Sequence, residues 1–257
     1  MAGDGLILRT ARPEDVRGLA RLESDCWPGT LAASEEQIAA RLAAYPDGQW
    51  VAETSNRLLG YSSAQRIDAT RLNTLPLTYG SITDLDRFTA THESEGAIYQ
   101  LVGVSSHPSA RGQRIGRQLV DLQVTRGWSL PGVHSVLGFT RPTGRHLSPG
   151  VPLDDYVSSH EDGSTTDPTL SFHTAAGAVV LSHHENFRPN DHESLGSGVL
   201  ISYPRPNPAS DPGAPTPSRY NDQPTRVTWT PTIRTNGNHT FPAPLDDLRR
   251  GNEPGTG

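Results

Sequence analysis

The chain has 257 residues, which is long for one small domain and short for two, and its formal net charge is −6. All 22 basic residues are arginine, and no basic patch is interleaved with aromatic residues, which argues against nucleic acid as a partner. The single cysteine, Cys26, excludes a disulfide framework and a cysteine-based zinc site. The N-terminal stretch MAGDGLILRT has no long apolar run, so we expect neither a signal peptide nor a membrane span, and a cytoplasmic location.

Hydrophobic periodicity in the first part of the chain predicts a strand, two helices and a hairpin. In chain order these are a strand from Leu6 to Arg9, a helix from Pro13 to about Cys26, a helix from Ser34 to Tyr45, and strands at Gln49–Thr54 and Leu58–Arg66. The second helix opens with a capping-box pattern at Ser34. Residues 67–96 are polar, and we expect an irregular loop over the active-site face.

A strand, a short glycine-containing loop and a helix follow between Ala97 and Val120. This order presents free backbone N–H groups at a helix N-terminus, and these amides with the helix dipole form a site for phosphate or pyrophosphate. A Walker A loop is excluded because the chain has no lysine, and a Rossmann fingerprint because only Gly112 and Gly116 are available. An ordinary strand-to-helix turn is the alternative interpretation.

The remainder of the chain predicts three more strands, one helix and a tail. The elements are a strand at His134–Thr140, a helix that starts at Asp167-Pro168 and ends at Gly177, and strands at Val179–Phe187 and Gly198–Tyr203. Residues 142–166 are an insertion rich in Gly, Pro, Ser and Asp. The last 54 residues hold 11 of the 22 prolines. We therefore predict a folded domain over 1–203 and a proline-rich tail over 204–257, disordered or loosely docked, in which Asn236-Gly237 favours a weak hairpin.

Three motifs downstream of the loop carry candidate chemistry: GFTR with Thr140, DPTLSFH with His173, and FRP with Arg188. Each alone has an ordinary interpretation, as a β-branched strand residue, a structural histidine and a solvated charge. Metal binding is not expected elsewhere. His183 and His184 alternate faces of a strand and cannot both ligate one ion. The acidic residues around His160 are more consistent with a solvated loop.

The loop resembles the pyrophosphate loop of the GCN5-related N-acetyltransferases (GNAT), Arg/Gln-x-x-Gly-x-Gly/Ala, with Arg111, Ile115 and Gly116 in the expected places. Arg114 replaces the first glycine, which keeps the amide but requires a backbone conformation that a Cβ tolerates. The resemblance and the element order imply a GNAT fold of the α/β (α+β) class, a mixed central sheet of about six to seven strands with flanking helices. The residues it assigns to coenzyme A are Val104, Ser105, Ser106, Arg111, Gly112, Gln113, Arg114, Ile115, Gly116 and Arg117.

The three motifs together resemble those of GNAT-type loading domains that open some polyketide assembly lines. Those domains decarboxylate malonyl-CoA or methylmalonyl-CoA and pass the acyl group to an acyl carrier protein. The resemblance covers Leu6 to Tyr203 and implies that Thr140, His173 and Arg188 are catalytic. It implies a coenzyme A thioester (malonyl-, methylmalonyl- or acetyl-CoA) as substrate, a carrier protein or small molecule as acceptor, and no metal.

The residue types fit this chemistry, because loss of CO₂ from a malonyl thioester leaves an enolate whose oxygen needs hydrogen-bond donors. Thr140 and His173 can supply them, and His173 or its water can protonate the enolate carbon. Arg188 suits the malonyl carboxylate or a phosphopantetheine, and the resemblance favours the acyl-transfer step. One alternative is an acetyl-CoA-dependent N-acetyltransferase for a small-molecule amine, with a base near Glu93 and Glu95. Another is an idle acyl-CoA-binding scaffold whose tail recruits a partner.

Overall fold

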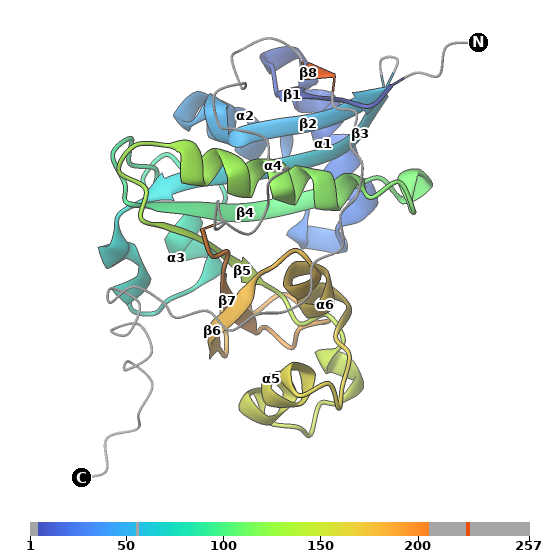
Figure 1. Cartoon of the computed structure of the whole chain (residues 1–257), viewed down its shortest axis with the longest axis vertical. Coiled ribbons are helices and arrows are strands. Elements are labelled where there is room, and N and C mark those ends of the chain that lie inside the picture. Colours follow the sequence, from blue (N-terminus) through green and yellow to red (C-terminus); the bar gives the residue numbers. More distant parts are fainter. Residues whose placement is uncertain (1–4, 55–56, 206–224, 227–257) are drawn as a thin grey trace.

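The computed structural model describes residues 5–54, 57–205 and 225–226, and one mixed sheet runs through them (Figure 1). The strands are β1 (Ile7–Thr10), β2 (Gln49–Thr54), β3 (Arg57–Ile67), β4 (Ile98–Ser106), β5 (Ser135–Thr140), β6 (Val179–His184), β7 (Gly198–Ser202) and β8 (Thr225–Arg226). Within this part of the chain the sheet has the order β6-β7-β5-β4-β3-β2-β1-β8. β4 and β5 are parallel, and the other neighbouring strands are antiparallel. The expected mixed α/β sheet with flanking helices is confirmed.

Helices cover both faces of the sheet because successive strand residues point to opposite sides. The helices are α1 (Val16–Cys26), α2 (Glu35–Ala44), α3 (Tyr79–Thr83), α4 (Ile115–Ser129), α5 (Leu153–Glu161) and α6 (Pro168–Ala175). Val51 of β2 packs in a core cluster with α1 and α2, whereas the next residue, Ala52, packs in a cluster with α4. Figure 1 shows α4 running along β4, while α5 and α6 lie beside β6 and β7.

Short-range sequence signals decide where these helices begin and end. The Ser34 hydroxyl accepts from the Gln37 amide, and the Gln37 side chain accepts from the Ser34 amide, so the expected capping box forms. At α6, Asp167 Oδ1 accepts from the amides of Thr169 and Leu170, both at 2.9 Å. Shorter 3-10 turns lie at Pro13–Asp15, Gly29–Leu31, Pro46–Gly48, Ala69–Asn73, Pro108–Ala110 and Arg145–Leu147.

The two central strands separate part way along their length. β4 pairs with β5 only from Ile98 to Leu101, opposite Ser135–Gly138. Beyond Leu101, β4 continues to Ser106 against β3 alone, with an irregularity at Val102, and the end of β5 pairs with β7 alone. Strands that diverge in this way leave one edge of β4 without a strand partner. The opening between them positions the cavity described below.

Two sequence expectations need correction. Residues 67–96 are not wholly irregular, because they contain a 3-10 turn and the short helix α3. The 142–166 insertion contains α5, which packs Leu153, Tyr156 and Val157 into the core, so the acidic residues around His160 lie on and just beyond a helix rather than in a solvated loop. The apolar i, i+3, i+4 spacing of that helix was obscured by the polar residues around it. The two-residue strand β8, paired with β1, takes the sheet to eight strands.

The predicted division between a domain and a tail stays a prediction, because most of residues 204–257 lies outside the described part of the chain. The hairpin expected around Asn236-Gly237 lies outside the described residues. Among the helices that are described, none has the length and apolar character needed to cross a bilayer.

Candidate active site

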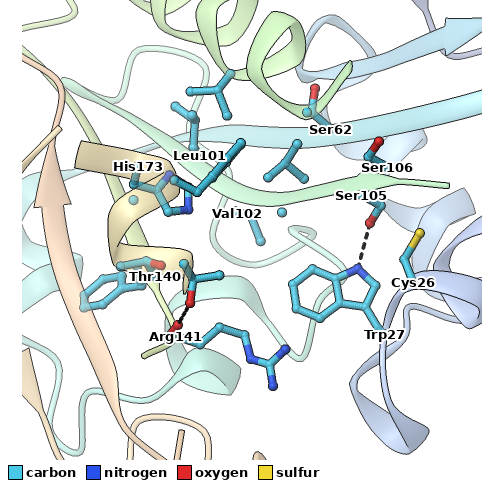
Figure 2. A pocket seen from close by; sticks show the side chains of 18 of the residues that line it. Cys26, Trp27, Ser62, Leu101, Val102, Ser105, Ser106, Thr140, Arg141 and His173 are labelled. Atoms are coloured by element: carbon cyan, nitrogen blue, oxygen red, sulfur yellow. Dashed lines mark hydrogen bonds between the residues drawn. The ribbon is translucent and has the colours of Figure 1, made fainter. Parts of the chain in front are cut away.

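A cavity of about 370 Å³ lies where β4 and β5 separate. It is bounded by the end of α1, the free edge of β4, the start of α4, the end of β5, α6 and the β6–β7 loop. Figure 2 shows His173 and Thr140 on one side of this cavity and Trp27, Cys26 and Ser105 on the other. Its lining includes Cys26, Trp27, Tyr79, Val104, Ser105, Ser106, Arg111, Gly116, Thr140, Arg141, Phe172, His173, Arg188 and Tyr203.

The loop before α4 brings backbone amides to one end of the cavity. Gly112 and Arg114 both take left-handed backbone conformations, with φ of 85° and 57°. The first bond of α4 runs from the Gln118 amide to Arg114 O (3.0 Å), so the amides of the preceding first turn have no partner within the helix. Arg114 thus keeps the left-handed geometry that a glycine adopts freely, at a cost of about 1–2 kcal/mol. An anion at this helix end would meet both free N–H groups and the positive end of the helix dipole.

The residues assigned to coenzyme A by resemblance divide into three groups. Val104, Ser105, Ser106, Arg111 and Gly116 line the cavity. The exposed loop residues Gly112, Gln113 and Arg114 lie beside it without lining it. Ile115 is a core residue at 1% exposure, and the Arg117 side chain is engaged by Asp121 at 2.8 Å and by the Ala175 carbonyl at 2.5 Å.

His173 is held as a neutral imidazole. α6 places it in the cavity wall, where its Nδ1 lies 2.6 Å from the hydroxyl of Tyr203. Burial lowers the pKa of His173 to about 4, and burial raises the pKa of Tyr203 well above its usual value. Both groups are therefore neutral near pH 7. Because the buried phenol needs an acceptor, Tyr203 O–H donates to Nδ1, which leaves the proton of His173 on Nε2 as a donor.

Thr140 presents a buried hydroxyl without a partner. The residue ends β5 and is 3% exposed, and within the described part of the chain its Oγ1 makes no hydrogen bond. A buried hydroxyl without a partner costs about 1–3 kcal/mol. Thr140 and His173 line the same cavity, so it carries two neutral hydrogen-bond donors in its wall.

Two of the arginines that line the cavity, Arg141 and Arg188, differ in how their charge is balanced. Arg141 makes a paired contact with Asp191, at 2.6 Å from both Nε and Nη2, and a further 2.7 Å contact with Glu193. Arg188 has no carboxylate of the described residues within ion-pair distance, and it donates to the Leu31 carbonyl at 2.9 Å. Arg188 is thus a cation in the cavity wall that is not already neutralised.

A hydrogen-bonded chain on the opposite wall was not foreseen from the sequence. Trp27 Nε1 donates to Ser105 Oγ at 2.7 Å (Figure 2). Ser105 in turn donates to Glu23. Glu23 is 6% exposed, and burial raises its pKa. An acidic residue and a tryptophan at helical spacing near the end of α1 were available signals. Ser105, the partner of both residues, lies 78 residues after Trp27 and 82 after Glu23, so these hydrogen bonds could not be predicted from the local sequence.

The other residues considered from the sequence lie away from the cavity. Glu93 pairs with Arg71 at 3.3 Å and Glu95 is exposed, and neither lines the cavity. His183 contacts Asp154 at 2.9 Å. The described residues contain no cluster of three or more metal-ligating side chains.

The sequence and fold were compared with those of known proteins. No family model matches the chain. The solved structure titled GphF GNAT-like decarboxylase in complex with isobutyryl-CoA is 30% identical, with a TM-score of 0.66 over 76% of this chain and 97% of that one. The loading GNATL domain of CurA from Lyngbya majuscula is 29% identical, with a TM-score of 0.68 over 77% and 96%. This chain therefore belongs to the GNAT superfamily, and its fold is similar to that of the GNAT-like decarboxylases.

Two proteins of Bacillus subtilis (strain 168) are also similar in sequence. The uncharacterized N-acetyltransferase YkwB is 26% identical over 209 residues, which cover 78% of this chain and 89% of YkwB. The probable hydrolase YhcX is 24% identical over 198 residues, 77% of this chain, but these span only 38% of YhcX.

Proposed function

We propose that this protein decarboxylates malonyl-CoA or methylmalonyl-CoA and transfers the resulting acyl group to an acyl carrier protein, in polyketide-type natural-product biosynthesis. One observation carries the proposal: an unpartnered buried hydroxyl, Thr140, and a neutral imidazole, His173, line the same cavity of a GNAT fold. The similarity of this chain to the GNAT-like decarboxylase GphF and to the loading GNATL domain of CurA also supports the proposal.

Coenzyme A would occupy the cavity with its pyrophosphate at the start of α4. The free amides there and the cavity-lining guanidinium of Arg111 suit two phosphate groups. The free edge of β4 from Val102 to Ser106 offers backbone groups to the amides of the pantetheine arm. Isobutyryl-CoA is bound in the structure of GphF, which is consistent with this assignment.

In the proposed decarboxylation, the two hydrogen-bond donors Thr140 and His173 stabilise the enolate that forms. The bond between the α-carbon and the carboxylate breaks, CO₂ leaves, and the electron pair moves into an enolate with its charge on the thioester oxygen. Thr140 O–H and His173 Nε2–H donate to that oxygen as the charge develops, and each such donor is typically worth about 3 kcal/mol at the transition state. The enolate carbon then takes a proton from a water molecule that His173 Nε2–H holds, and the hydroxide left behind takes a proton from solvent.

The neutral state of His173 suits this role. A neutral N–H donor interacts more strongly with the thioester oxygen as negative charge develops on it, so it stabilises the transition state more than the ground state. With a pKa of about 4, His173 stays neutral throughout the physiological range.

The amine N-acetyltransferase alternative has weaker support in the cavity. It requires a general base near the thioester, and the residues expected to supply one, Glu93 and Glu95, do not line the cavity. Of the described carboxylates, Asp25 alone is in the lining, and it lies 3.5 Å from His107 with a side chain that is 56% exposed.

The deciding experiment incubates the protein separately with malonyl-, methylmalonyl- and acetyl-CoA and follows each thioester by mass. We expect loss of CO₂ from one or both of the carboxylated thioesters. Addition of a phosphopantetheinylated carrier protein should then move the acyl group to the carrier thiol. A protein that leaves both carboxylated thioesters intact and acetylates an amine from acetyl-CoA would contradict the proposal.

A further inference from the structure

The β6–β7 loop holds Arg188 by its backbone at the cavity wall. The Arg188 amide donates to Gly196 O at 2.8 Å, and the carbonyl of the preceding Phe187 accepts from the Tyr79 amide at 2.7 Å. The start of α3 and the residue before Arg188 are therefore tied by main-chain bonds, which do not depend on the side chain at position 79. This contact joins two segments more than one hundred residues apart in the sequence.

The side chain of Arg188 lies against aromatic rings. Its guanidinium carbon is 4.0 Å from the centre of the Tyr79 ring and 5.7 Å from that of Trp27. Both distances lie within the range of cation–π attraction, and the Tyr79 contact is the closer. A guanidinium has five donors, and its hydrogen bond to Leu31 O uses one of them. Ring contacts hold the flat face of the group, so its remaining donors stay available at the edge.

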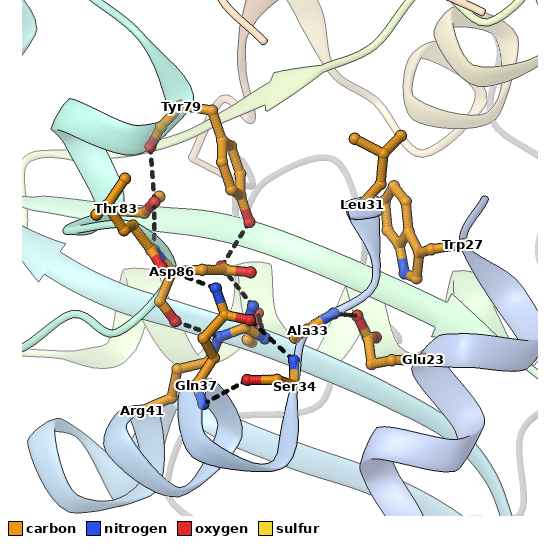
Figure 3. Close-up of polar contacts among 12 residues, drawn as sticks. Glu23, Trp27, Leu31, Ala33, Ser34, Gln37, Arg41, Tyr79, Thr83 and Asp86 are labelled. Atoms are coloured by element: carbon orange, nitrogen blue, oxygen red, sulfur yellow. Dashed lines mark hydrogen bonds and ion pairs between the residues drawn. The ribbon is translucent and has the colours of Figure 1, made fainter. Parts of the chain in front are cut away.

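Tyr79 is itself fixed by a buried ion pair (Figure 3). Its hydroxyl donates to Asp86 Oδ1 at 2.6 Å, and the same carboxylate pairs with Arg41. Arg41 and Asp86 are 3% and 4% exposed. Burial and the Asp86 carboxylate raise the pKa of Tyr79 well above its usual value, so the hydroxyl remains a donor. The ring is thereby held at both ends, by the backbone of α3 and by Asp86.

The turn that presents Asp86 is strained. Asp84, Leu85, Asp86 and Phe88 all have positive φ, between 50° and 76°. Each non-glycine residue in this region costs of order 1 kcal/mol, and such strain persists only where surrounding contacts over-determine it. Here α2 supplies those contacts, since Gln37 Nε2 donates to Leu85 O at 2.9 Å and Arg41 Nε to Asp86 O at 3.0 Å.

We infer that Tyr79 is a positioning residue, and that its ring holds the guanidinium of Arg188 to receive the free carboxylate of the acyl group. The inference rests on the proposed function and assigns the residues that receive the carboxylate of its substrate. The other two arginines of this region, Arg41 and Arg141, are already paired with Asp86 and Asp191. Arg188 therefore supplies the charge that a second anionic group of the ligand requires, rather than serving the acyl-transfer step.

The test measures binding of two unreactive ligands by calorimetry. S-(2-carboxyethyl)-CoA replaces the thioester carbonyl of malonyl-CoA by a methylene and keeps the terminal carboxylate, and S-propyl-CoA has the same chain with a methyl end. Neither can lose CO₂. The ratio of their dissociation constants isolates the contribution of the carboxylate, because the nucleotide and pantetheine contacts cancel. For the wild-type protein we expect a preference of at least about tenfold for the carboxylated ligand.

Variants at positions 79 and 188 locate the source of that preference. Tyr79→Phe keeps the ring and should retain the preference to within about threefold. Tyr79→Leu and Tyr79→Met remove the ring and should reduce the preference to near unity, with S-propyl-CoA bound as tightly as before. Arg188→Ala should do the same. Adding Tyr79→Leu to Arg188→Ala should cause no further loss, because the two residues act through one contact.

If Tyr79 had a purely structural role, its replacement would weaken the binding of both ligands by the same factor. The ratio of their dissociation constants would then stay unchanged. The inference is overturned if Tyr79→Leu or Tyr79→Met keeps the wild-type ratio, or if the wild-type protein binds both ligands equally. These outcomes are separate from the proposed function. A wild-type protein with the carboxylate preference that leaves malonyl-CoA intact refutes decarboxylation alone, and one that releases CO₂ without the preference refutes the role of Tyr79 and Arg188 alone.

Discussion

Replacement of Thr140 by valine should make the protein more stable and less active at once. Valine has nearly the shape of threonine, so the packing at the end of β5 is kept while the hydroxyl is removed. In the wild-type protein this hydroxyl is 3% exposed and has no partner among the described residues. Removing an unsatisfied buried polar group recovers about 1–3 kcal/mol of unfolding free energy.

The loss of activity follows from the role proposed for the same hydroxyl. If it donates to the enolate oxygen, Thr140→Val removes a donor that acts only as charge develops. The rate of CO₂ release from malonyl-CoA should then fall roughly 10²- to 10³-fold with little change in KM. For a chain of this size each 1 kcal/mol shifts Tm by about 2–4 °C, so we expect Tm to rise by about 2 °C or more.

The measurements are thermal unfolding by circular dichroism and acyl-CoA mass over time. Thr91→Val is the matched control, because Thr91 is 2% exposed, lies outside the cavity lining and donates to Gln65 at 2.8 Å. This control should lower Tm and leave CO₂ release unchanged. A Thr140→Val protein that is less stable than the wild type yet releases CO₂ at the wild-type rate would refute the reasoning.

Three further predictions concern other parts of the molecule. Burial holds the pKa of His173 at about 4 against 6.5 in a free chain, so only the unfolded state takes up this proton as pH falls from 6.5. The wild type should therefore lose roughly 3 kcal/mol more unfolding free energy than His173→Gln by pH 4, measured in denaturant titrations. A Cβ at Gly116 would approach Phe172 no closer than 3.5 Å, so Gly116→Ala should bind coenzyme A normally. The negative charge in Gly116→Asp should weaken coenzyme A binding at least about tenfold, as measured by calorimetry. Deleting residues 206–257 removes β8, which pairs with β1 at only two residues, and keeps the Arg205 contact with Trp128, so Tm and coenzyme A affinity should stay nearly unchanged.

The element order could be predicted from the sequence because its signals are local. The cap at Asp167 with Pro168, the capping box at Ser34 and the glycine at position 177 each involve residues within four positions of one another. Such contacts form between residues that are close together in the chain, so they can be predicted from the amino-acid sequence. The helix α5 was missed because its buried residues are few and stand among charged ones.

The candidate catalytic residues could be listed from the motifs, but their surroundings could not be predicted. Nothing near Thr140 in the sequence shows that its hydroxyl is buried with no partner in the described part of the chain, or that His173 meets Tyr203 thirty residues later. Both facts depend on where β5, β7 and α6 pack. Burial, which sets the pKa of His173, is a property of the packed chain.

The GNAT order of strands and helices, the loop before α4 and the candidate residues Thr140, His173 and Arg188 could all be read from the amino-acid sequence. The folded chain was needed to show that Arg188 lies on the ring of Tyr79 and has no carboxylate partner among the described residues. The physical reason is distance along the chain. Local hydrogen bonds and periodicity are encoded within a few residues, whereas burial, charge pairing and ring contacts arise between segments that meet only when the sheet has formed.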